Sequence, residues 1–149
     1  MLTYLAQPID RGDGNPSQQA QDTMLELRKC GYNGGFFSPA PAFDFAGTPV
    51  HESIHAVVDI NRHALEQCSA MLLVYRPGVE SWGCPQELLF AWSSMIPVVV
   101  LLPKGHDGKL PTYLSAWVKS ENLAVSPSKA ATRLNEIFTR DLIERVSHA

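Results

Sequence analysis

The sequence predicts a three-layer α/β domain with a five-stranded parallel sheet, a flavodoxin/Rossmann-like arrangement. Three segments carry this prediction because they are almost wholly apolar and do not alternate with polar residues: 2–6, 70–75 and 97–103. Such runs are typical of strands that are covered on both faces, as in a parallel sheet. Helical patterns lie between the runs, and strands that alternate with helices form layered α/β domains with right-handed crossovers.

Weaker patterns complete the expected elements. Two further strands are expected at residues 34–39 and 122–126. The expected helices are residues 16–30, 51–67, 84–95, 112–119 and 128–146. The first of them begins at Pro16 and ends before Gly31, the usual asymmetry of helix starts and stops. The 149 residues contain no repeat and no linker, so we expect one domain over residues 1–149.

The composition excludes several classes of protein. Charged residues make up 18% of the chain, the net charge is −3, and Lys and Arg form no run, which argues against nucleic acid as a partner. The longest purely apolar run, VVVLL after Pro97, is too short to cross a membrane. The first residues lack the pattern of a signal peptide, and the three cysteines have no metal-type spacing. We therefore expect a reduced, cytoplasmic protein.

Ligands of parallel α/β sheets bind at the carboxyl ends of the strands, so the candidate site residues follow the strands. The segments concerned are residues 7–14, 38–43, 76–83 and 103–109, and Glu87 opens the helix that follows residues 76–83. A carboxylate among apolar neighbours is costly unless it is paired, exposed at a cleft or used, which makes Glu87 a candidate nucleophile. The simpler interpretation is an acidic residue in the first turn of a helix, worth about 0.3 kcal/mol or more.

The loop after the first strand mixes Gly, Asp and Arg. Its backbone N–H groups and Arg11 would suit a phosphate, and a solvated turn explains the loop equally well. The loop is neither a Walker A loop nor a dinucleotide-binding fingerprint, which counts against ATP and NAD, so we expect no cofactor. His51 and His55 form a His-x-x-x-His pair, but a surface helix explains it more simply, and we expect no metal.

Three segments taken together resemble the nucleoside 2-deoxyribosyltransferase superfamily. They are YLAQPIDRG, NRHALEQCSAMLLVY and SWGCPQELLFAWSSMIPVVVLL, and the resemblance spans about residues 2–117. It implies that the first strand ends at the sugar site. It also implies that Glu87 attacks C1′ of the ribose or deoxyribose, with Tyr4 orienting the carboxylate.

Ser81 indicates a branch of that superfamily. Members that act on free nucleosides usually carry Asp six residues before the nucleophile, whereas this chain carries Ser81. In this it resembles the 2′-deoxynucleoside 5′-monophosphate N-hydrolases and the cytidine 5′-monophosphate hydrolases. A hydroxyl can donate to a 5′-phosphate that a carboxylate would repel. Ser115 resembles a serine that reaches the phosphate in a neighbouring subunit, which implies a homodimer with composite active sites.

Assistance to the departing base has two candidates. The acidic residue that the superfamily carries in the helix before the third strand aligns with Asn61, and Asp59 lies two residues earlier. Either side chain would position or protonate the base. The expected substrate-binding residues, around the sugar and the phosphate, are Gln7, Ile9, Arg11, Gly12, Gly14, Ser81, Gly83 and Ser115.

The predicted function is hydrolysis of the N-glycosidic bond of a (deoxy)nucleoside 5′-monophosphate, with a pyrimidine base favoured. A glutamyl-glycosyl intermediate would form and then be hydrolysed to (deoxy)ribose 5-phosphate, as in retaining glycosidases. Two other functions are compatible with the residues. One is base exchange between deoxynucleosides, and the other is a nucleotide-binding module without catalysis.

Overall fold

The computed structural model describes residues 1–8, 15–40, 51–79 and 83–148. Within these ranges, five parallel strands form one sheet in the order β2-β1-β3-β4-β5, which confirms the predicted sheet. The strands are β1 (Leu2–Ala6), β2 (Gly35–Phe37), β3 (Ala70–Val74), β4 (Val98–Leu101) and β5 (Leu123–Ala124). This strand order is that of flavodoxin-like folds.

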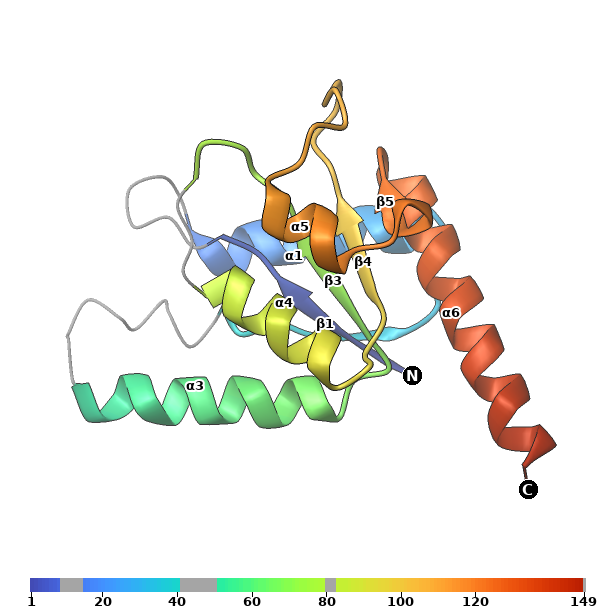
Figure 1. Cartoon of the computed structure of the whole chain (residues 1–149), viewed down its shortest axis with the longest axis horizontal. Helices are drawn as coiled ribbons and strands as arrows, with labels where there is room; N and C mark the ends of the chain where they lie inside the picture. The colour runs from blue at the N-terminus through green and yellow to red at the C-terminus, as the bar shows by residue number, and fades with distance from the viewer. Residues whose placement is uncertain (9–14, 41–50, 80–82, 149) are drawn as a thin grey trace.

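Helices cover both faces of the sheet, so the predicted three layers are confirmed (Figure 1). One face packs against α1 (Pro16–Lys29) and α6 (Pro127–Ser147). The other face packs against α3 (His51–Glu66), α4 (Gly83–Ser93) and α5 (Thr112–Trp117). Side chains of β1 alternate between the two faces: Leu5 joins the core under α1 and α6, whereas Tyr4 joins the core under α3, α4 and α5.

Local sequence signals set where α1 and α6 begin. Asn15 caps α1 by accepting from the Gln18 amide at 3.1 Å, and Ser126 caps α6 by accepting from the Lys129 amide at 3.2 Å. A proline follows each cap and needs no hydrogen-bond acceptor in the first turn.

Three strands are markedly shorter than predicted: β2 is limited to Gly35–Phe37, β4 to Val98–Leu101, and β5 has two residues instead of five. Asn122 belongs to a short 3-10 helix, Ser120–Asn122, that precedes the strand. The buried Asn122 side chain accepts from Arg133 Nε of α6 at 2.7 Å, which holds this residue in the turn and out of the sheet.

The connections define where a ligand would bind. The chain leaves β1 toward α1 on one face and leaves the neighbouring β3 toward α4 on the opposite face. The carboxyl ends of β1 and β3 therefore form the topological switch point of the sheet, the place where open α/β sheets bind their ligands.

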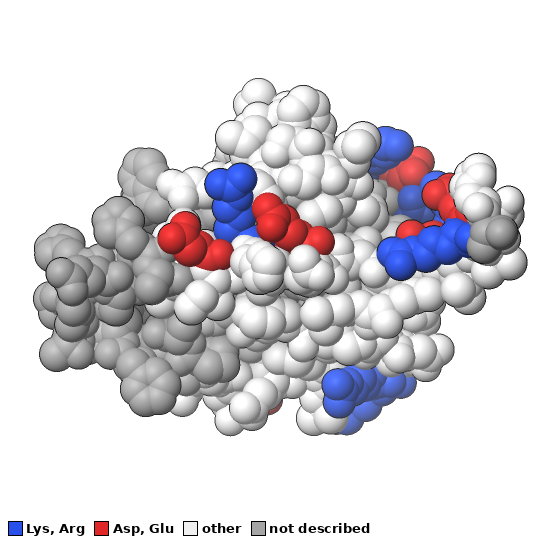
Figure 2. Space-filling model, turned by 90° about the horizontal axis from the view of Figure 1, so that it is seen from below, with Lys and Arg blue, Asp and Glu red and all other residues white. Residues whose placement is uncertain are grey.

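Two further properties concern the surface. None of the described helices combines the length and the apolar character that a bilayer crossing requires. On the face seen in Figure 2, Lys and Arg lie next to Asp and Glu along the upper part of the view, and one basic group lies apart from acidic side chains at the lower edge. The pair Arg62–Glu66 on α3, with 3.8 Å between Nε and Oε1, is one example of this mixing.

Candidate active site

The structure brings Tyr4 and Glu87 together. The Tyr4 hydroxyl donates a hydrogen bond to Glu87 Oε1 at 2.5 Å. Tyr4 is the middle residue of β1 and is fully buried on the face that α4 covers. Glu87 projects from α4, so the contact joins two residues that are 83 positions apart in the chain.

The helix position of Glu87 differs from the sequence expectation. α4 begins at Gly83, so Glu87 is its fifth residue, and the first turn contains no acidic residue. Its N-terminal backbone N–H groups are a turn away, where the favourable effect of the helix dipole on a carboxylate has largely ended. The interpretation of Glu87 as an ordinary acidic residue of a first turn is therefore wrong, and Tyr4 is its partner instead.

The environment adjusts the ionisation of both groups. Burial raises the pKa of Glu87 to about 7, and the hydrogen bond from Tyr4 lowers it in part. Burial also raises the pKa of Tyr4, and the neighbouring Glu87 charge raises it further, so the phenol stays neutral and remains a donor. A partly buried carboxylate that ionises near neutral pH and is held by one neutral donor is suited to nucleophilic or acid–base chemistry.

Aromatic side chains follow the carboxyl ends of β3 and β4, and Tyr75 packs against the core cluster to which Tyr4 belongs. The rings of Tyr75 and His106 meet edge to face with centroids 5.4 Å apart. Burial raises the pKa of Tyr113 on α5, and the neighbouring Tyr75 and Cys84 add to the shift. Sequence reasoning did not assign roles to these residues, although Tyr75 and His106 lie at strand ends where it expected the site.

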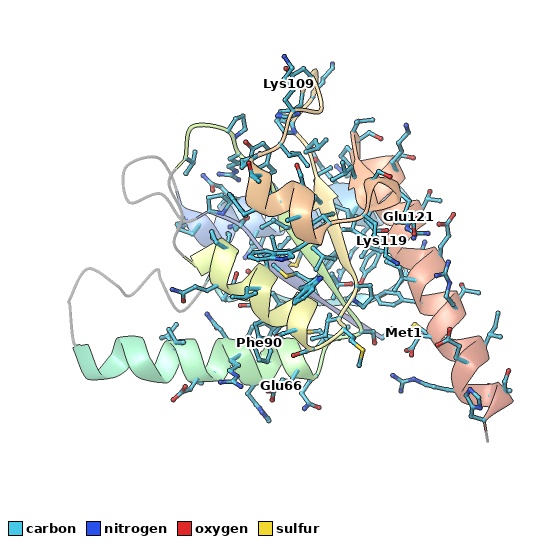
Figure 3. All side chains as sticks on the ribbon, viewed as in Figure 1. Met1, Glu66, Phe90, Lys109, Lys119 and Glu121 are labelled. Carbon is cyan, nitrogen blue, oxygen red and sulfur yellow. The ribbon has the colours of Figure 1, made fainter. Side chains whose placement is uncertain are left out.

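The two candidates for base assistance lie on different faces of α3. Asn61 is buried, with 8% of its surface exposed, and shares its side of the helix with the buried Leu65 four residues later. Asp59 is exposed. On the same helix, the Arg62 guanidinium lies 4.8 Å above the ring of Phe90, which extends from α4 toward α3 (Figure 3). The inward face of α3 near α4 thus presents the amide and not the carboxylate.

Three more of the expected substrate-binding residues lie in the described part of the chain. Gln7 is buried directly after β1; its Nε2 donates to the Pro16 carbonyl at 2.8 Å, and its Oε1 has no donor among the described residues. Gly83 is exposed, and a Cβ there would meet no described atom within 4 Å. Ser115 is exposed on α5, and its hydroxyl donates to the Pro111 carbonyl at 3.4 Å. The other predicted contacts lie outside the described residues: Ile9, Arg11, Gly12, Gly14 and Ser81.

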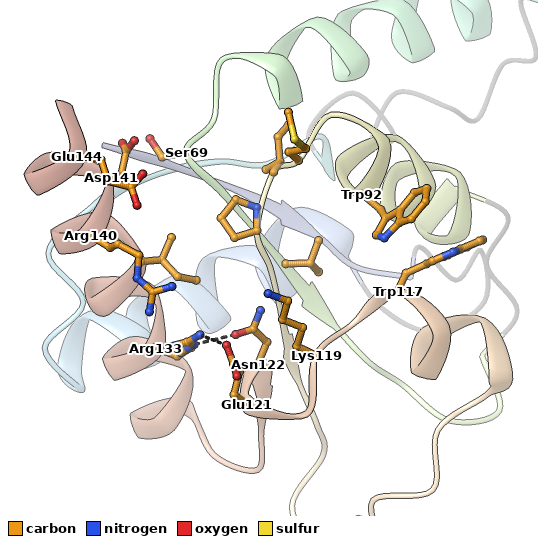
Figure 4. Close-up of a pocket in the computed structure, with 15 residues that line it drawn as sticks. Ser69, Trp92, Trp117, Lys119, Glu121, Asn122, Arg133, Arg140, Asp141 and Glu144 are labelled. Atoms are coloured by element: carbon orange, nitrogen blue, oxygen red, sulfur yellow. Dashed lines mark hydrogen bonds and ion pairs between the residues drawn. The ribbon is translucent and has the colours of Figure 1, made fainter. Parts of the chain in front are cut away.

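A hollow of about 490 Å³ lies elsewhere, beside the amino ends of β3 and β4 (Figure 4). Trp92 and Trp117 line one part of it with ring centroids 6.3 Å apart, and Arg133 lines another part. Arg133 forms ion pairs with Glu121 and Glu136, with distances of 2.8 and 2.9 Å between its Nη atoms and the carboxylate oxygens. This hollow contains neither Tyr4 nor Glu87, so its size does not make it the place of the chemistry.

The described residues offer no group of three or more His, Cys, Asp or Glu side chains that could hold a metal ion. Cys68 and Cys84 are both buried, and burial raises the pKa of Cys68 to about 11. Among the described residues, the Tyr4–Glu87 pair is therefore the candidate for nucleophilic or acid–base chemistry.

Comparisons with known proteins give the fold. No family model matches the chain, and no curated protein sequence has a significant match. Among solved structures, a 2-deoxyribosyltransferase from Bacillus psychrosaccharolyticus matches with a TM-score of 0.69 and 14% identity, over 88% of this chain and 90% of that one. A conserved protein from Enterococcus faecalis V583 matches with a TM-score of 0.62 and 18% identity, over 93% and 98%.

A CMP N-glycosidase from Clostridium botulinum, BcmB, also matches, with 14% identity over 91% of this chain and 99% of that one. Its TM-score is 0.48. The neighbours thus include proteins of the kind that the sequence resembles, and the chain has the α/β fold of the 2-deoxyribosyltransferase over most of both lengths.

Proposed function

We propose that this protein hydrolyses the N-glycosidic bond of a (deoxy)nucleoside 5′-monophosphate, with a pyrimidine base favoured. The observation that carries the proposal is the hydrogen bond from Tyr4 to Glu87 beside the switch point of the sheet. The shared fold with a 2-deoxyribosyltransferase supports it, as does the sequence resemblance around both residues.

In the first step, the ionised Glu87 attacks C1′ of the sugar. Tyr4 occupies Oε1, which leaves Oε2 as the attacking atom. The new C1′–O bond forms while the bond from C1′ to the base breaks, and the base leaves with the electron pair and takes a proton from water. Asn61, buried on α3, positions the departing base. The product is a glycosyl ester of Glu87.

In the second step, water attacks C1′ and breaks the ester. The hydroxyl stays on C1′ to give (deoxy)ribose 5-phosphate, the remaining proton is released, and Glu87 returns as a carboxylate. The Tyr4 hydroxyl donates to this carboxylate as its charge develops, so it favours the departure of Glu87. Ser81, Arg11, and the backbone of Gly12 and Gly14 would hold the substrate phosphate.

The decisive test is Glu87→Gln, which keeps the size of the side chain and removes the nucleophile. We expect release of free base from nucleoside monophosphates to fall below about 1% of the wild-type rate, since nucleophile removal typically costs several orders of magnitude. Glu144→Gln, an exposed glutamate on α6, is the control and should retain full activity. A panel of ribo- and deoxynucleoside monophosphates, assayed by chromatography, identifies the substrate. Full turnover by the Glu87 variant would overturn the proposal.

Base exchange between deoxynucleosides is the second candidate, since the fold is shared with a 2-deoxyribosyltransferase. In that reaction an acceptor base, and not water, attacks the glycosyl ester. Ser81 argues for the hydrolase because the usual Asp is absent. Supplying a second base separates the reactions: a new nucleoside indicates exchange, and free sugar phosphate indicates hydrolysis.

We also propose that the protein works as a cytoplasmic homodimer, in which Ser115 of one copy reaches the phosphate in the other. The exposed side chains of Leu89 and Trp92 on α4, close to α5, supply apolar surface for such an interface. Light scattering on the purified protein gives the oligomeric state. If a dimer forms, Ser115→Ala should raise the KM for nucleotides, and the dimer should remain intact.

A further inference from the structure

Arg76 lies directly after β3, at the switch point between β1 and β3. Its Nη1 donates a hydrogen bond to Oε1 of Gln19 on α1 at 2.6 Å. The side chain is partly buried, so this hydrogen bond fixes the guanidinium beside α1, on the face of the sheet opposite to α4.

The partner of Arg76 is a neutral amide. Within the described ranges, Arg62, Arg133 and Arg145 each pair with a carboxylate, whereas no carboxylate pairs with Arg76. A guanidinium has five N–H donors in a planar fork, and Gln19 accepts from one nitrogen of it. Among the described residues, Arg76 therefore has further N–H donors that could bind an anion.

The start of α1 adds to the positive potential at this place. Gln19 is the fourth residue of α1, whose first turn contains no acidic residue and whose N-terminus, capped by Asn15, is the positive end of the helix dipole. Gln7, at the end of β1, holds this turn in place through its hydrogen bond to the Pro16 carbonyl. The α1 side of the switch point is thus suited to an anion, whereas the α4 side presents Glu87.

We propose that Arg76 binds the 5′-phosphate of the substrate and that Gln19 positions it for this role. The inference rests on the proposed function, and it specifies how a monophosphate is distinguished from a nucleoside. A nucleotide has an anionic end and a glycosidic carbon, and the switch point has a positioned cation on one side and a nucleophile on the other. Binding energy from the phosphate then accelerates bond cleavage at C1′.

The test compares Arg76→Gln and Arg76→Lys with Arg28→Gln, an exposed arginine at the far end of α1 that carries the same charge change. The readout is kcat/KM for a nucleoside monophosphate divided by kcat/KM for the matching nucleoside. We expect this ratio to fall about 10- to 100-fold in Arg76→Gln, in line with the loss of a charge-assisted hydrogen bond. Arg76→Lys should lose less, and Arg28→Gln should match the wild type.

An equal fall on both substrates, with the ratio unchanged, would mean that Arg76 only braces α1 against the sheet, and would overturn the inference. If Glu87→Gln abolishes cleavage while Arg76→Gln leaves the ratio intact, the proposed function stands and this inference fails.

If the wild type cleaves neither substrate, the effect of inorganic phosphate on Tm tests the anion site at Arg76 without relying on catalysis. A phosphate-induced rise in Tm that is present in wild type and in Arg28→Gln and absent in Arg76→Gln supports the anion site. A rise that persists in Arg76→Gln, or no rise in wild type, overturns it.

Discussion

The Tyr4 hydroxyl lies 2.5 Å from Glu87 Oε1 and joins the middle of β1 to the second turn of α4. The pair combines two opposite influences on one carboxyl group. Burial favours its protonated form, and the phenol favours the ionised form. The balance places ionisation near neutral pH, where a nucleophilic carboxylate can be both available and reactive.

Removal of the phenol should shift the pH dependence of catalysis. In Tyr4→Phe the influence that lowers the pKa of Glu87 is lost, so the pKa rises above about 7. Because the nucleophile must be ionised, the acidic limb of the kcat/KM profile should move to higher pH, and activity at pH 7 should fall about tenfold or more.

Tyr32→Phe provides the control for this shift. The Tyr32 hydroxyl donates to the Gly35 carbonyl, is hydrogen-bonded to the Thr3 hydroxyl, and belongs to the core on the opposite face of the sheet. The variant should lower Tm and leave the pH profile in place. An unshifted profile in Tyr4→Phe would contradict the role of the phenol.

Neutralising Glu87 should stabilise the protein at high pH. The pKa of Glu87 is raised from 4.5 to about 7 in the folded state, so folding opposes its ionisation. Below about pH 4.5 the group is protonated in both states, and wild type and Glu87→Gln should be equally stable. As the pH rises from about 4.5 to about 7, wild type should lose about 1–3 kcal/mol of unfolding free energy relative to the variant, and the difference should stay constant above that range. Urea unfolding at pH 4.5 and pH 8 measures the difference, with Glu144→Gln as the control.

Asn61 and Asp59 should differ in their effect on base release. Asn61→Ala removes a buried amide from the side of α3 that faces the core, and we expect kcat to fall about tenfold. Asp59→Asn changes an exposed side chain and should stay within about twofold of wild type. Steady-state kinetics on the monophosphate, with thermal unfolding to confirm folding of both variants, separates the two. If Asp59→Asn lowered kcat more than Asn61→Ala did, base assistance would be assigned to Asp59.

Replacement of Met95 by glycine should stabilise the folded protein. Met95 lies in the turn two residues after α4, with a φ of 59°, a left-handed conformation that costs a non-glycine residue about 1 kcal/mol, and 90% of its surface is exposed. Met95→Gly should therefore raise the unfolding free energy by about 0.5–1 kcal/mol without affecting catalysis. A lower Tm in the variant would show that the Met95 side chain makes a stabilising contact, for example in a dimer.

The sheet could be predicted from the sequence because its central strands are buried on both faces. All five residues of β3 are buried, so the run reads as continuously apolar, and the same holds for β4. β5 was predicted too long because the side chain of Asn122 bonds to α6 and not to the strand ladder, a contact that no local pattern reveals.

The candidate site was predictable only in part. Glu87 stood out because a carboxylate among apolar neighbours at a strand end is unusual, but its link to Tyr4 came from a family resemblance. Arg76 was not identified, because its significance depends on Gln19, which is 57 residues away in the chain. Contacts across such separations arise from the strand order, which hydrophobic patterns do not encode.

The position of Tyr4 in the sheet has a consequence for the growing chain. β1 precedes β3 in the chain, yet Tyr4 reaches Glu87 only after β3 has paired beside β1, with Tyr4 opposite Met71, and α4 has packed over both. A ribosome-bound chain that stops before α4 lacks the proposed nucleophile, and a misregistered β3 would displace it. The proposed activity would therefore require that β1, β3 and α4 have already packed together during folding.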